Sequence, residues 1–89
     1  MNGPPGFEQL FVSATYAALA SVPPRSAGVV VAVEKAPVRY TAYSTIPPSA
    51  SVGVLLAIGD ALRYDYDPTR LLFCAATAGA TAVLQADYQ

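Results

Sequence analysis

The sequence predicts an all-β fold: a small antiparallel β-sandwich or jelly-roll-like barrel with an extended N-terminal arm. Prolines recur at intervals of 10 to 20 residues, and short apolar segments lie between them. Several of these segments are rich in β-branched residues or alternate between apolar and polar positions. Short strands between regularly spaced turn residues are typical of small sandwiches and barrels. The 89 residues suit one β domain, placed at 7–89 behind an arm at 1–6.

The N-terminal half contains one ambiguous segment and two clearer strands. Apolar residues in segment 7–20 satisfy both the strand period and the helix period, and the β-branched Val12 and Thr15 favour the strand. Segment 28–35 is a nearly continuous β-branched run, which suits a strand covered on both faces. Segment 37–43 follows as a strand in which Val38, Tyr40 and Ala42 share one face.

The C-terminal half predicts four further strands. Segment 51–63 has apolar residues at helical spacing, but Gly53 and the Gly59-Asp60 turn signal favour two short strands, 54–57 and 61–64. One or two helical turns are the alternative. Segments 71–77 and 80–88 form the best hairpin candidate, with Ala78-Gly79 as the turn. In the last strand the residues of one face are Ala82, Leu84, Ala86 and Tyr88.

The composition excludes several classes of function. The chain has no His and one Cys, so His-based acid–base catalysis and most zinc sites are absent. Five basic residues do not make a nucleic-acid-binding face. Proline, glycine and hydroxyl residues interrupt the apolar stretches before they reach membrane-spanning length. We therefore expect no catalytic residue, cofactor, metal, nucleic acid or membrane, and a buried, inert thiol at Cys74.

The chain has too few charged residues to cover the surface of an isolated soluble domain. Charged residues make up 12% of the chain, about half the usual fraction, whereas 54% of residues are hydrophobic. Seventeen of the hydrophobic residues are Ala, which contribute little burial to the core. Both observations predict that neighbouring chains cover part of the surface, as in an obligate oligomer or a subunit of a larger assembly.

Two polar motifs have a structural and a functional interpretation. Tyr64-Asp65-Tyr66-Asp67 combines carboxylates and aromatic rings, which suits calcium or a sugar, but it also fits a strand end at which Asp67 caps the following turn. The capping interpretation is favoured. Glu34 and Arg39 flank a predicted turn between adjacent strands, and we expect an ion pair across it.

The stretch from Val33 to Tyr88 resembles small structural proteins of tailed bacteriophage particles. The elements that carry the resemblance are Val33-Glu34, Pro37-Val38-Arg39-Tyr40, Ile46-Pro47-Pro48-Ser49, Gly53-Val54-Leu55-Leu56, Gly59-Asp60-Ala61-Leu62 and the run from Leu72 to Ala82. Such proteins are β-sandwiches, often trimeric, that decorate or cement a capsid or sit at the neck and tail. The family has no catalytic residues to carry over.

The resemblance implies a non-enzymatic protein of the virion, assembled in the host cytoplasm. Its expected partners are further copies of itself, with a trimer favoured, and the major capsid protein or other virion proteins. A capsid decoration or cement protein is the first interpretation; a neck or tail accessory protein and a small glycan- or ligand-binding β module are the alternatives. The candidate interface residues are Pro4, Pro5, Phe7, Arg39, Tyr40, Tyr43, Tyr64 and Tyr66.

Overall fold

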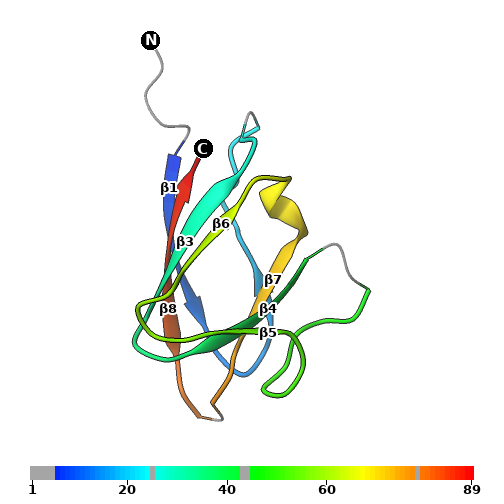
Figure 1. Ribbon diagram of the computed structural model, residues 1–89, viewed down its shortest axis with the longest axis vertical. Coiled ribbons are helices and arrows are strands. Elements are labelled where there is room, and N and C mark those ends of the chain that lie inside the picture. Colours follow the sequence, from blue (N-terminus) through cyan, green and yellow to red (C-terminus); the bar gives the residue numbers. More distant parts are fainter. Residues whose placement is uncertain (1–5, 25, 43–44, 78) are drawn as a thin grey trace.

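The computed structural model describes residues 6–24, 26–42, 45–77 and 79–89, which form two four-stranded antiparallel sheets (Figure 1). Sheet A has the order β1-β8-β3-β6, and sheet B has the order β2-β7-β4-β5. This order is the jelly roll, in which eight strands form two interleaved Greek keys. The all-β sandwich prediction is therefore confirmed. The strands are β1 (Gly6–Val12), β2 (Ala17–Ala18), β3 (Val29–Glu34), β4 (Val38–Ala42), β5 (Val54–Leu56), β6 (Ala61–Tyr64), β7 (Leu71–Ala75) and β8 (Ala82–Tyr88), and a 3₁₀ turn, η1, spans Pro68–Arg70.

Consecutive strands mostly lie in opposite sheets. Among the described strands, β4 and β5 are the only sequence neighbours that pair with each other. The predicted hairpin of segments 71–77 and 80–88 is therefore wrong, because β7 pairs with β2 and β4 whereas β8 pairs with β1 and β3. The apolar faces of β7 and β8 meet across the core rather than side by side. A period of two is the same in both arrangements, so the alternation could not distinguish them.

Both ambiguous segments contain strands, and neither forms an α-helix. β1 ends at Val12, the chain bends through 13–16, and β2 takes up Ala17–Ala18. The structure therefore confirms the strand interpretation over the first half of segment 7–20. β5 and β6 reproduce the two short strands expected around the Gly59-Asp60 turn. β1 begins at Gly6, so this residue belongs to the strand, and the rest of the expected arm, 1–5, lies outside the described residues.

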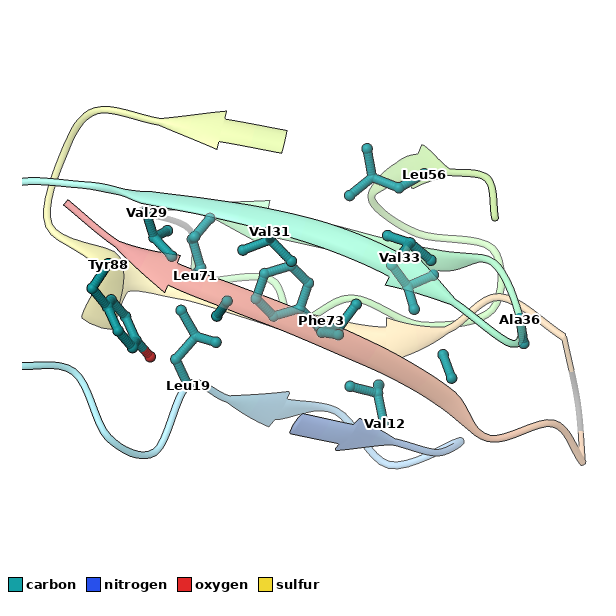
Figure 2. Packing of buried hydrophobic residues seen from close by; sticks show 14 residues of the cluster. Val12, Leu19, Val29, Val31, Val33, Ala36, Leu56, Leu71, Phe73 and Tyr88 are labelled. Atoms are coloured by element: carbon teal, nitrogen blue, oxygen red, sulfur yellow. The ribbon is translucent and has the colours of Figure 1, made fainter. Parts of the chain in front are cut away.

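The core lies between the sheets and has β8 at its centre (Figure 2). Every second residue of β8 is fully buried, from Ala82 to Tyr88, as the alternation predicted. Val29, Val31 and Val33 of β3 enter the same layer, and Phe73 of β7 faces them from sheet B (Figure 2). The outer face of β3 is only half-buried, which corrects the expectation of a strand covered equally on both faces.

The connection from β3 to β4 crosses between the sheets in three residues. Lys35 takes a φ of 74°, and the Ala36 N–H donates to the Glu34 carbonyl at 2.9 Å. This left-handed conformation is costly for a residue with a Cβ, and it turns the chain sharply enough to leave sheet A. Glu34 and Arg39 consequently lie in different sheets rather than on adjacent strands.

No helix in the described part of the chain has the length and apolar character needed to cross a membrane.

A substitution at Gly28, which directly precedes β3, tests how closely the chain packs against the end of β6 at this point. A Cβ at this position would lie 2.5 Å from the Tyr64 carbonyl oxygen and 3.1 Å from the Asp65 Cα. Because both obstacles are backbone atoms, we expect Gly28→Ala to lower the free energy of unfolding by roughly 2 kcal/mol or more, measured by urea denaturation.

Gly59→Ala is the matched control for this substitution. A Cβ at Gly59 meets no atom within 4 Å, so its only cost is the positive φ of 90°, about 1 kcal/mol. Equal effects of the two substitutions would contradict the packing argument.

Candidate functional site

Large apolar side chains are exposed on two opposite sides of the sandwich. On the first side, Phe7 and Phe11 project from the outer face of β1 and are 62% and 65% exposed. The second side is formed by β5, the loop before it and the turn after it. We call its exposed residues Val52, Val54, Leu55 and Ile58 the β5 patch. These two surfaces are the strongest candidates for contacts with other chains, because solvent-exposed apolar side chains that gather on one strand mark binding surfaces.

The β5 patch contains residues from both faces of its strand. Val54 pairs with Tyr40 on the inner face, yet it is 56% exposed because β5 is the edge of sheet B. Leu55 pairs with Arg39 on the outer face. Arg39 is half-buried, and its guanidinium donates to the carbonyls of Ala50 at 3.0 Å and Gly53 at 2.9 Å. Arg39 therefore binds the loop before β5 to sheet B and holds the β5 patch in position.

The expected pairing of Glu34 with Arg39 is wrong. Glu34 accepts a hydrogen bond from the side-chain amide of Gln85 at 3.2 Å, on the outer face of sheet A. The short connection between β3 and β4 sends the two residues to different sheets, and the loop carbonyls take the guanidinium instead.

The described candidate interface residues fall into two groups. Phe7 and Tyr66 are largely exposed, as an interface role requires. Tyr40 and Tyr64 are half-buried and pack against the core, and the Tyr40 ring lies 6.3 Å from that of Phe73. Arg39 supports the β5 patch as described above, whereas Pro4, Pro5 and Tyr43 lie outside the described residues.

The Tyr64–Asp67 motif is a strand end followed by a capped turn. The Asp67 carboxylate accepts hydrogen bonds from the Thr69 N–H at 3.0 Å and the Thr69 hydroxyl at 2.7 Å, which lower its pKa. Asp65 pairs with Arg63 at 3.2 Å, and the rings of Tyr64 and Tyr66 meet edge to face at 5.7 Å. The capping interpretation is confirmed. Within the described residues, no three acidic or Cys side chains gather in a group that would hold a metal ion.

A buried carboxylate at Glu8 lies at the end of the sandwich where β1 begins and β8 ends. Glu8 lies on the inner face of β1, and its carboxylate accepts the N–H groups of Ala20 and Ser21, each at 2.9 Å. It also accepts the Tyr88 hydroxyl at 2.5 Å. This site was not predicted, although the strand phase that faces Leu10 and Val12 inward also faces Glu8 inward.

The pKa values of this pair follow from the hydrogen bonds. Burial raises the pKa of Glu8, but the bonds from Tyr88, Ala20 and Ser21 together outweigh it and hold the pKa below its ordinary value of 4.5. Burial, together with the hydrogen bond to the Glu8 carboxylate and its charge, raises the pKa of Tyr88 well above its ordinary value of 10. Glu8 is therefore ionised and Tyr88 neutral at pH 7, and the carboxylate is bound by the Tyr88 hydroxyl and two backbone N–H groups.

Cys74 is buried on the outer face of sheet B, under the bend between β1 and β2. Its thiol donates toward the Ala14 carbonyl at 3.3 Å, and burial raises its pKa. The expectation of a buried thiol is confirmed.

Searches of protein-family models, of curated proteins and of solved structures find no match to this chain.

Glu8→Gln is expected to lower the free energy of unfolding by about 1–3 kcal/mol at pH 7, because it weakens three hydrogen bonds to a buried carboxylate. The folded-state pKa of Glu8 is depressed, so its contribution is complete above the unfolded-state value of about 4.5 and is lost as pH falls below it. Urea titrations from pH 7 to pH 3 should therefore show that the free energies of unfolding of the wild type and of Glu8→Gln converge as the pH falls.

Tyr88→Phe is the control, because it removes one of these bonds and keeps the carboxylate; we expect a loss of about 1 kcal/mol. A difference between the wild type and Glu8→Gln that stays constant down to pH 3 would contradict the ionic role of Glu8.

Labelling of Cys74 tests the cover that the 13–16 bend places over sheet B. We expect a thiol-specific disulfide reagent to react at least about a hundredfold more slowly with the folded protein than with the protein in urea, because access requires local opening. Equal rates in the two states would show that the bend does not protect the thiol.

Proposed function

We propose that this chain is a non-enzymatic structural protein of a bacteriophage virion, in particular a capsid decoration or cement protein that stabilises junctions between capsomers. The observation that carries the proposal is the placement of large exposed apolar side chains on both open sides of the sandwich, at β1 and at the β5 patch. A subunit held between neighbours needs contact surfaces on more than one side. The jelly-roll strand order is also common among viral capsid proteins, which is an argument by analogy.

The way the polar side chains are used supports a structural role. Glu8 joins three segments of the fold, Arg39 holds the loop before β5, and Asp67 caps η1. In addition, the Asp60 carboxylate accepts the Ala57 N–H at 2.8 Å and closes the turn between β5 and β6. These groups stabilise the fold and leave the surface contacts mainly to apolar side chains.

In this proposal the β5 patch binds other virion proteins. Its residues lie on a strand edge and a closed turn, so they are held in place before binding and lose little conformational freedom on docking. Specific protein contacts bury about 1,600 Å² in total, and the repetition of one contact over a lattice multiplies its effect on particle stability. A neck or tail position would use the same surfaces.

Bacteriophage particles from a culture that produces this chain provide the test. We expect density-purified particles to contain the chain at a copy number comparable with that of the major capsid protein, as measured by quantitative mass spectrometry. The purified chain should also rebind particles from which it has been removed. Its absence from particles, together with specific binding of glycans by the isolated chain, would overturn the proposal in favour of a ligand-binding module.

The double variant Leu55→Ser, Ile58→Ser tests the β5 patch. Both side chains are exposed, so the fold should persist while rebinding to particles weakens at least tenfold. Tyr16→Ser is the control, because Tyr16 is also a large exposed side chain but lies between β1 and β2, outside both the β5 patch and β1. An equal loss of binding in both variants would contradict a specific role for the patch.

A further inference from the structure

β1 is the longest edge strand of the described fold, and it is unprotected. It has seven residues, whereas the other edge strands, β2, β5 and β6, have two, three and four. Proteins usually protect long edges with proline, a bulge or outward-facing charge, because an open edge pairs readily with another strand. The register of β1 with β8 runs without interruption from Gly6 to Val12, and no proline lies within it.

The backbone of β1 has one free side. Outside its ladder with β8, none of the backbone hydrogen bonds between described residues involves Gly6–Val12. The one charged residue of the strand is Glu8, which faces inward and is bound to Ala20, Ser21 and Tyr88. The open edge therefore presents backbone N–H and C=O groups with no outward-facing charge to repel a partner strand.

The outer face of β1 has a symmetric pattern. Phe7, Gln9 and Phe11 project outward in sequence, and both Phe side chains are more than half exposed. Reversal of the strand about Gln9 exchanges the two Phe positions. An antiparallel copy of β1 placed along the open edge in this register sets each Phe opposite a Phe of the other copy, and aromatic pairs of this kind are among the favourable cross-strand pairs.

We propose that two copies of this chain pair antiparallel through β1, about a two-fold axis that passes beside Gln9. The two sheets A then form one continuous eight-stranded sheet. Gln9 lies opposite its own counterpart, and because Gln9 also pairs with Gln85 of β8, four glutamines line up across the dimer. On the inner face Glu8 comes opposite Leu10 of the second copy, so no like charges meet.

The pattern identifies the partner as a second copy. An isologous contact requires a surface that is complementary to itself, and the Phe-x-Gln-x-Phe spacing of residues 7–11 meets this condition. An unrelated extended peptide would also find backbone partners here, but the matched aromatic positions are supplied by the chain itself.

The contact is small, so the dimer is concentration-dependent. An aromatic side chain presents about 200 Å² when free, and the four partly exposed rings therefore offer roughly 500 Å². Stable complexes bury about 1,200 Å² or more, so we expect a weak dimer that forms at high protein concentration. This pairing gives dimers, whereas the resemblance to phage structural proteins implies trimers, and the two outcomes differ in mass.

Disulfide trapping tests the register. Residues directly opposite each other in antiparallel strands have Cα atoms about 4.5–5.5 Å apart, within the range of a disulfide. With the buried Cys74 replaced by Ala, Gln9→Cys should form a covalent dimer under mild oxidation. Phe7→Cys and Phe11→Cys should each stay largely monomeric alone and form a mixed dimer when combined. Ala61→Cys, exposed on the outer face of the opposite edge strand β6, is the control.

Sedimentation equilibrium tests the contact without a cross-link. We expect the wild type to shift from monomer to dimer with concentration, and Gln9→Lys to raise the dissociation constant about tenfold or more, since it sets two ammonium groups face to face. Ala61→Lys should leave the dissociation constant unchanged. A trimer or a strict monomer at high concentration, or equal trapping of the Gln9→Cys and Ala61→Cys variants, would overturn the pairing. None of these results depends on whether the chain binds particles.

Discussion

The alternation of strands between two sheets governs the rest of this structure. Because most strands are followed by a strand of the opposite sheet, they find most of their hydrogen-bonding partners far away in the sequence, and β1 pairs along its full length with β8. Neither sheet contains enough contiguous chain to form alone. The fold therefore depends on the apolar layer between the sheets, in which Phe73 of sheet B belongs to one buried cluster with Val31 and Leu84 of sheet A. Topologies of this kind are stabilised by tertiary packing rather than by local preference.

Local chemistry was predictable from the sequence where a short pattern determines the outcome. The alternation in β8, the inward face of β4 and the cap at Asp67 all follow from rules that involve a few neighbouring residues. The assignment of strands to sheets was not predictable, because alternation identifies an apolar face without saying whether the next strand lies beside it or across from it. The role of Glu8 escaped prediction for a related reason. Its partners, at positions 20, 21 and 88, come from segments that only the fold brings together.

The small number of charged residues has a direct structural counterpart. Eleven residues of 89 are charged, and several of those described are bound to backbone groups within the fold. Little charge is then left for the outer faces, where Phe7, Phe11 and the β5 patch are exposed instead. The unusual composition and the apolar edges thus have one origin: polar side chains are used to hold irregular segments in place, and contact surfaces are built from apolar ones.

The central position of β8 affects how the protein is made. This strand follows all the other described strands in the sequence, yet it lies between β1 and β3 and supplies the middle of the core (Figures 1 and 2). Until its final residues emerge, β1 lacks its ladder and Glu8 lacks the hydroxyl of Tyr88. The sandwich therefore cannot close before β8 has been synthesised. Loss of the last residues of β8 removes the segment that joins β1 to the rest of the domain.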